Sequence, residues 1–291
     1  MNELRLKELK QIELERGSKV MVLAASMLDA EILPNLYEIL LDVGKTERLD
    51  VVLYGRGGEI NATRRIALLL HQFAEKLCFI VPYHCQSSFT VLSLSGHELI
   101  AGDLAGFSPI DPRMNAVGEG VGVDVLDSEN IRLFNEMGRE WFQLDIEQEE
   151  TRMQLLASVA SSIFPTTLTS LYRSGLELQQ IASELLSFQL PEATPDQKSD
   201  IINQLLYEYH SHSYAITREE LHQLGLKIKR EVSIENLAWK IAKELNRVMG
   251  GGVRKTPDDP RIDVLLATSK VAYLRQRHVD RIAPVWEEIK L

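Results

Sequence analysis

Two short segments carry the residue types that acyl-transfer chemistry needs. Gly57 and Gly58 follow the apolar run 51–54 and precede a helical pattern, so the backbone can turn sharply there and approach a ligand closely. Ser87 follows a second apolar run, 77–81, and also precedes a helical pattern. A serine at such a junction lifts its hydroxyl above the sheet, and the next amide has no acceptor within the helix. Together the segments can supply a nucleophile and donors for an oxyanion.

Each segment also has a purely structural interpretation. The diglycine fits a tight strand-to-helix turn, and Ser87 fits a helix N-cap. The diglycine is not a phosphate loop, because no Gly-Lys-Ser/Thr follows it, and 55–58 does not match the dinucleotide-binding pattern. Cys85 is an alternative nucleophile, but a cysteine at this place more often fills a small buried site.

The order of these segments, followed by Ser108–Pro112, resembles the serine dehydrogenase proteinase family of the Clp-protease/crotonase superfamily. Residues 51–66 resemble that family's strand, Pro-Gly-Gly and helix, with Arg56 in place of the usual proline. Residues 81–90 resemble its Val-Pro-x-x-x-x-Ser-Ala-Gly-Thr segment, with Ser88-Phe89 in place of Ala-Gly. Residues 108–112 resemble Gly-Pro-Val-Asp-Pro. Residues 212–226 resemble His-x-Tyr-Pro-Ile-Thr-x-Glu-Glu-Ala and Leu-Gly-Leu, so the resemblance covers about residues 20–230.

The resemblance implies a serine peptidase that hydrolyses peptide bonds. Ser87 would attack the scissile carbonyl, and the backbone N–H groups of Gly58 and Ser88 would hold the oxyanion. Gly57 and Asp111 would support the site. The implied fold is an α/β, Clp/crotonase-like core of stacked ββα units, with a helical C-terminal part that serves assembly. We expect a homo-oligomer acting on a peptide or protein substrate, with no cofactor and no metal.

The general base is not fixed by the resemblance. Clp-type peptidases place a histidine about two dozen residues after the serine, but here that region gives Ile110 beside Asp111, and no histidine occurs from 98 to 209. A serine hydroxyl needs a base within hydrogen-bond reach. We favour His212, which matches a family position. The alternatives are two other histidines or a Ser–Lys dyad, with the candidates His210, His84, Lys19, Lys45, Lys76, Lys227 and Lys229.

Two further functions compete with peptide hydrolysis. The side chain of Phe89 stands where the family has glycine, and it could crowd the turn. If it blocks the substrate, the chain is an inactive oligomeric scaffold of the same fold that binds peptides or proteins. The third hypothesis is a crotonase-like enzyme that uses the oxyanion hole on a coenzyme A thioester. That activity needs a basic cluster near an adenine pocket, and the sequence has no clear one.

The elements around these segments alternate between strands and helices. Short apolar runs predict strands at 20–25, 51–54, 77–81 and 98–102. Helical patterns lie at 29–43, with a break or kink near Pro34, and begin again near 59 and 87. Such alternation predicts a mostly parallel sheet covered on both faces. Ligands then bind at the carboxyl ends of the strands, where both chemistry-bearing segments lie.

The remaining chain is mainly helical. Residues 2–16 predict an N-terminal helix that docks or self-associates, and residues 115–122 predict a loop. Helical patterns cover 129–187 with a break at Phe164-Pro165, then 197–209, a short helix opened by the Thr217 capping box, 233–248 and 279–290. A strand fits 262–267, and 254–260 fits an exposed connection. The domain limits we predict are an arm at 1–17, a core at 18–128 and a helical region at 129–291.

Composition excludes several classes of protein. The chain has 291 residues with 32 Lys+Arg against 42 Asp+Glu, and the net charge of -10 argues against a general nucleic-acid binder. Only two cysteines are present, which argues against a disulfide scaffold or a structural zinc site and favours a reducing cytoplasm. The sequence contains no run of 18 apolar residues without a charge, so we expect no membrane-spanning helix. The N-terminal residues show no signal-peptide pattern.

Overall fold

The protein is built around one mixed β-sheet. The structure, a computed structural model, describes residues 4–115, 125–249, 261–277 and 285–290. The centre of the sheet is parallel and has the strand order β1-β2-β3-β5-β9. These strands are β1 (Lys19–Ala25), β2 (Thr46–Gly55), β3 (Ala74–Val81), β5 (Glu98–Ala101) and β9 (Ile228–Lys229). The first four are the predicted apolar strands, so the α/β class is confirmed.

The other edge of the sheet is antiparallel. β10 (Arg261–Thr268) pairs with β1, β11 (Val271–Arg277) pairs with β10, and β12 (Val285–Lys290) pairs with β11. The sheet is therefore less uniformly parallel than predicted. The predicted last helix is wrong for residues 285–290, and 279–284 lie outside the described residues. Residues 285–290 form backbone hydrogen bonds with β11 as an edge strand, and this pairing outweighs the helical pattern of their sequence.

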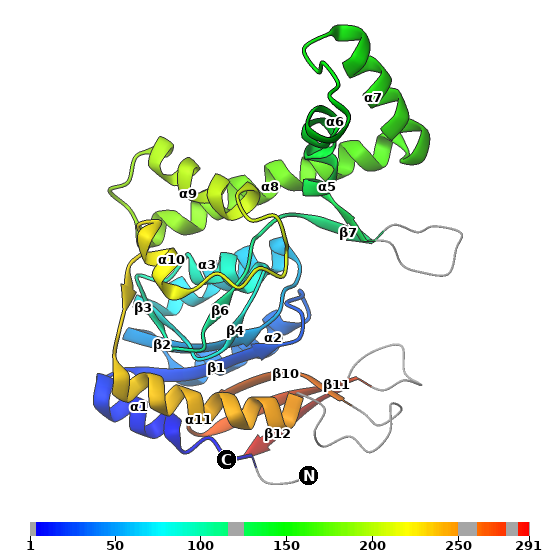
Figure 1. Cartoon of the computed structure of the whole chain (residues 1–291). Helices are drawn as coiled ribbons and strands as arrows, with labels where there is room; N and C mark the ends of the chain where they lie inside the picture. Colours follow the sequence, from blue (N-terminus) through cyan, green and yellow to red (C-terminus); the bar gives the residue numbers. More distant parts are fainter. Residues whose placement is uncertain (1–3, 116–124, 250–260, 278–284, 291) are drawn as a thin grey trace.

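Two layers of helices cover the sheet, as predicted (Figure 1). Side chains of β1 alternate between the two layers, with Met21 and Leu23 in one apolar cluster and Val20 and Val22 in the other. The first layer holds α2 (Ile32–Val43), α3 (Ile60–Phe73) and α4 (Ser88–Ser93), and the second holds α1 (Glu8–Arg16) and α11 (Val232–Met249). α2 is not broken at Pro34, because that proline lies in the first turn, where its missing N–H has no helical partner to lose.

The middle of the chain forms the remaining helices. They are α5 (Ser128–Arg132), α6 (Phe134–Phe142), α7 (Glu149–Ser162), α8 (Pro165–Gln189), α9 (Pro195–Tyr207) and α10 (Arg218–Gln223). The predicted break is confirmed because Pro165 opens α8, and Thr217 and Glu220 form the predicted capping box of α10. α6 and α7 project away from the sheet (Figure 1). β7 (Arg113–Asn115) and β8 (Val125–Asp127) form a hairpin that adjoins α5.

The predicted connection at 254–260 lies outside the described residues, and so does the predicted loop at 115–122 except for its first residue. In the part of the chain that is described, no single helix has the length and apolarity to cross a membrane. α7 and α8 meet that requirement only as a pair, by length and composition, and they are bent by 102° at the break between them.

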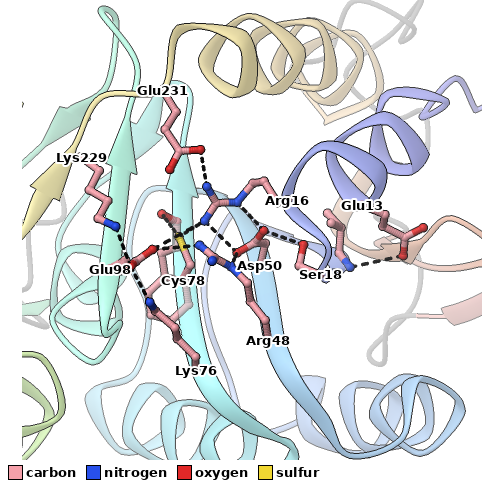
Figure 2. Close-up of polar contacts among 12 residues, drawn as sticks. Glu13, Arg16, Ser18, Arg48, Asp50, Lys76, Cys78, Glu98, Lys229 and Glu231 are labelled. Carbon is pink, nitrogen blue, oxygen red and sulfur yellow. Dashed lines mark hydrogen bonds and ion pairs between the residues drawn. The ribbon is translucent and has the colours of Figure 1, made fainter.

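The N-terminal helix α1 is fixed to its own sheet. Leu9 and Ile12 are fully buried against the α11 side, and the Arg16 side chain is only 4% exposed. Arg16 Nε donates to Asp50 Oδ2 at 2.6 Å, and its Nη1 pairs with Glu231 (Figure 2). The predicted arm therefore docks within the chain, through a buried ion pair at the amino end of the strands.

Asp50 is fully buried in this network, and Ser18 Oγ also donates to it at 2.7 Å. We expect Asp50→Asn to lower the free energy of unfolding by about 3–5 kcal/mol, because it leaves the buried Arg16 without its full counter-charge. Urea unfolding measures this loss. Glu184→Gln is the control, because the side chains of the Arg64–Glu184 pair are 40% and 36% exposed and the pair should contribute at most about 1 kcal/mol. Equal losses in the two variants would contradict the assignment.

Glu98 is the second buried carboxylate of the network (Figure 2). Lys76 Nζ and Lys229 Nζ each lie 2.7 Å from its Oε1, and Arg48 Nη2 lies 2.9 Å from Oε2. Burial alone would raise the pKa of Glu98, but the hydrogen bonds and charges of Lys229, Lys76 and Arg48 outweigh it and lower the pKa to about 2.

A carboxyl whose pKa is lowered by folding adds stability above its unfolded pKa, and that stability is lost as the pH falls through the folded value. We therefore expect the free energy of unfolding to fall by on the order of 3 kcal/mol from Glu98 alone between pH 5 and pH 2. Urea unfolding at a series of pH values measures it. Glu98→Gln should be less stable at pH 7 and should flatten this part of the profile; an unchanged slope would contradict the assignment.

Candidate active site

Ser87 has a backbone conformation that few serines adopt. It follows the two-residue strand β4 (His84–Cys85) and precedes α4, with φ 53° and ψ -119°. Among the described residues, the only other non-glycine with a positive φ is Gln143, which ends α6 in an ordinary left-handed turn. Ser87 occupies the N-cap position of α4, but its side chain makes no capping hydrogen bond, so capping does not account for the serine. A strained serine between a strand and a helix is the geometry of a nucleophile elbow.

Two buried hydroxyls hold the elbow. Ser87 N donates to Ser108 Oγ at 2.8 Å, and Ser108 N donates to Thr90 Oγ1 at 3.2 Å. Thr90 Oγ1 donates in turn to Cys85 O at 2.8 Å. The chain of bonds ties the residues on both sides of Ser87 to the strand β6 (Gly106–Phe107). Sequence analysis noted the segment of Ser108 but missed these roles.

The diglycine corner lies directly against Ser87. A Cβ placed on Gly57 would be 3.5 Å from Ser87 Cβ and 3.7 Å from Ser87 Oγ. Gly58 has a φ of 148°, and a Cβ there would be 2.3 Å from the backbone N of Leu28. Ser88 Oγ donates to Gly58 O at 2.6 Å, which joins the corner to the start of α4. The structure thus brings the two predicted segments together.

The N–H groups of Gly58 and Ser88 are available for a ligand. Leu28 N donates to Gly57 O at 2.8 Å and Glu59 N donates to Leu28 O at 2.8 Å, so Gly58 itself gives no N–H to this bridge. Within the described residues, neither the Gly58 N–H nor the Ser88 N–H has a protein acceptor. Ser87 is half-buried, and its Oγ makes no hydrogen bond to the described residues. A substrate carbonyl could therefore meet a free hydroxyl and two free donors.

Phe89 does not crowd the turn. Its side chain is fully buried, and a Cβ placed on Gly55 would be 2.0 Å from Phe89 Cε2, so the ring packs directly on that glycine. The ring lies under the corner, inside the apolar cluster of the α2–α4 side. The expectation that this side chain blocks the site is therefore wrong, because Gly55 leaves room for the ring in the core.

Cys85 is unsuited to be the nucleophile. It is fully buried, its Sγ lies 3.3 Å from Phe89 O, and burial raises the pKa of its thiol. A thiol in this environment stays protonated and inert. The structural interpretation of Cys85, a small buried packing residue, is confirmed.

His212 and Asp111 form a pair at the edge of the site. Phe107 and Ile216 form an isolated antiparallel bridge, which brings the segment after Phe107 beside the segment before Ile216. His212 Nδ1 lies 2.7 Å from Asp111 Oδ1. Because a carboxylate only accepts, Nδ1 carries the proton of the neutral ring and Nε2 keeps the lone pair.

The His212–Asp111 pair is linked to Ser87 through the segment of Ser108, but it makes no hydrogen bond to Ser87. Asp111 is three residues from Ser108, a span of at most about 11 Å, and Ser108 accepts from Ser87 N. No hydrogen bond joins His212 to Ser87 Oγ in the described part of the chain. Asp111 Oδ2 is buried with no hydrogen-bond partner among the described residues, while Arg113 Nε lies 3.8 Å from it.

The other base candidates are less suitable. His84 Nε2 lies 3.4 Å from Arg56 Nη2, and burial and then the Arg56 charge lower the pKa of His84. His210 is exposed and has no contact with the site residues among the described residues. The lysines lie at the amino ends of the parallel strands, away from Ser87, with Lys76 and Lys229 bound to Glu98; the others are Lys19, Lys45 and Lys227.

Comparison with known proteins gives two solved structures. No family model and no curated protein matches the chain. The structure is similar to a membrane-bound stomatin-specific protease, solved as a mutant, with 11% identity and a TM-score of 0.45 over 79% of this chain and 85% of that one. It is also similar to a putative enoyl-CoA hydratase/isomerase from Acinetobacter baumannii, with 11% identity and a TM-score of 0.26 over 72% of this chain and 94% of that one.

Neither similarity assigns the chain to a family. Membership in the serine dehydrogenase proteinase family stays a prediction, as do the domain limits.

The strain at Ser87 is open to a direct test. A non-glycine residue in this conformation costs about 1–3 kcal/mol, whereas glycine adopts it freely at an entropic cost of about 0.5–1 kcal/mol. We expect Ser87→Gly to have a free energy of unfolding about 1 kcal/mol higher than Ser87→Ala, measured in urea.

The control is Ser199, an exposed residue within α9. There the order should reverse, because alanine is favoured over glycine in a helix by about 1 kcal/mol. If Ser87→Ala is as stable as Ser87→Gly, the strained conformation is wrong.

Proposed function

We propose that the protein is a serine peptidase with Ser87 as its nucleophile. The observation that carries this proposal is the strained Ser87 elbow, with its free hydroxyl against Gly57 and beside the free N–H groups of Gly58 and Ser88. Strain of this kind persists only where the surroundings enforce it, and here Ser108 and Thr90 do so.

In the proposed reaction, Ser87 Oγ attacks the carbonyl carbon of the scissile peptide. The developing oxyanion accepts hydrogen bonds from Gly58 N–H and Ser88 N–H, and losing one such donor typically costs about 10²–10³ in rate. The serine proton passes to a base, which then returns it to the leaving amine. Water hydrolyses the acyl-serine by the same steps in reverse and frees the enzyme.

We propose His212 as that base, held and oriented by Asp111. The Nδ1 contact at 2.7 Å supports this role because it leaves Nε2 free to accept a proton and places a carboxylate beside the imidazolium that would form. Catalytic hydrogen bonds are often long in ligand-free enzymes and shorten when substrate binds. The proposal therefore requires Nε2 to reach Ser87 Oγ in the substrate complex.

The wider expectations remain proposals as well. We expect peptide or protein substrates, a cytoplasmic location and no cofactor. A homo-oligomer is supported by large apolar side chains exposed on the projecting helices, of which Trp141 is 74% exposed and Phe142 64% exposed. Contiguous exposed apolar surface often marks an interaction site.

A fluorophosphonate probe tests the proposal, because it reacts only with an activated serine. The wild type should be labelled at Ser87, as located by mass spectrometry, and Ser87→Ala should not be labelled. His212→Ala should slow labelling by about 10²–10⁴, the usual contribution of a general base.

Two variants serve as controls: Ser213→Ala, which removes an exposed serine, and His222→Ala, which removes another histidine. Both should be labelled at the wild-type rate. A folded wild type that is not labelled would contradict the proposal and favour the inactive oligomeric scaffold. Labelling that His212→Ala leaves unchanged would contradict only the choice of base.

A further inference from the structure

Arg56 stands at the entrance to the diglycine corner. It directly follows β2 and precedes Gly57, the residue that lies against Ser87. Its side chain is exposed, while the residues on either side of it, Gly55 and Gly57, are buried. Arg56 is therefore an exposed cation two residues before Gly58, whose N–H has no acceptor among the described residues.

An aromatic cluster fixes the direction of this side chain. Arg56 Nη2 lies 3.4 Å from His84 Nε2, and since a guanidinium only donates, that nitrogen of His84 is the acceptor. The His84 ring lies 3.9 Å from the Tyr83 ring and 5.6 Å from the Tyr54 ring, centroid to centroid. Tyr83 in turn contacts Trp239 of α11 edge to face, at 6.0 Å. The guanidinium is thus held at the α11 side of the corner.

The charge of Arg56 is not neutralised within the described chain. No carboxylate among the described residues lies within 4.0 Å of it, although the protein carries an excess of acidic residues. The nearest polar contact is a neutral imidazole, and burial and the Arg56 charge both lower the pKa of His84, which keeps it neutral. An arginine held in place with its remaining N–H groups free can bind a carboxylate through two parallel hydrogen bonds.

We propose that Arg56 recognises a carboxylate on the substrate, next to the bond that Ser87 cleaves. This inference rests on the proposed peptidase function and narrows the substrate class to peptides that carry an acidic group near the scissile bond. The carboxylate can come from an aspartate or glutamate side chain or from a free chain end. Arg56 would be a specificity-determining residue, and it takes no part in the proton transfers.

Binding to the Ser87→Ala variant tests the proposal without requiring hydrolysis. The probes are rhodamine-labelled nonapeptides of alternating leucine and alanine with a central glutamate, glutamine or lysine. Each is made with an amidated and with a free carboxyl end, and affinity is measured by fluorescence anisotropy. We expect the amidated glutamate peptide to bind about tenfold more tightly than the glutamine peptide, as a charge-assisted pair provides.

Changes at Arg56 should remove this preference without changing the fold. Arg56→Gln should bind glutamate and glutamine peptides equally, and Arg56→Glu should favour the lysine peptide. Arg139→Gln, which removes the charge of an exposed arginine on the projecting helix α6, should keep the full preference. If tighter binding follows the free carboxyl end rather than the side chain, the chain end is the source of the carboxylate.

The outcomes separate this inference from the proposed function. If Ser87 of the wild type is labelled by a fluorophosphonate but the peptides bind alike or not at all, the peptidase stands and the role of Arg56 is overturned. A preference for glutamate that survives in Arg56→Gln also overturns it. If Ser87 is never labelled but Arg56→Gln abolishes the preference for the glutamate peptide, the carboxylate site is supported and the proposed peptidase function is overturned.

Discussion

The site depends on a close approach of two backbones that only glycine permits. A Cβ on Gly58 would be 2.3 Å from Leu28 N, and a Cβ on Gly55 would be 2.0 Å from the Phe89 ring. The two glycines therefore have different roles. Gly58 lets the diglycine corner pack against the backbone of Leu28, and Gly55 leaves room in the core for the Phe89 ring. With both in place, Gly57 lies against Ser87.

The two ends of the parallel strands have separate roles. At the amino ends, buried charges such as Arg16, Asp50 and Glu98 hold α1, the sheet and β9 together (Figure 2). At the carboxyl ends, the strained Ser87 and the exposed Arg56 have no ionic partner among the described residues. Buried ion pairs also lie at this end, where Arg218 pairs with Glu235 and Arg275 pairs with Asp263, but Ser87 and Arg56 stay outside them. This is the end of the strands at which ligands bind in α/β proteins.

The sequence predicts the parts of this arrangement that depend on local patterns. Apolar runs locate β1, β2, β3 and β5, and the Thr217 capping box locates α10. The diglycine and Ser87 are recognisable because strand-to-helix junctions in neighbouring units meet at one edge. The antiparallel strand β12 is missed, because only its pairing with β11 distinguishes it from a short helix. The hydroxyls of Ser108 and Thr90 are missed for the same reason, since their contacts with the elbow are tertiary.

The sequence leaves open which histidine is the general base, and the contacts of His84 and His212 distinguish between them. His84 is only three residues from Ser87, but its Nε2 faces the positive Arg56, so a proton arriving there would meet a like charge. His212 is 125 residues away in the chain, yet the bridge of Phe107 with Ile216 brings the two segments together, and His212 Nδ1 bonds to Asp111 while Nε2 stays free. A proton taken from Ser87 is stabilised beside a carboxylate and opposed beside a guanidinium. Electrostatics therefore favours His212 as the base and leaves His84 to orient Arg56.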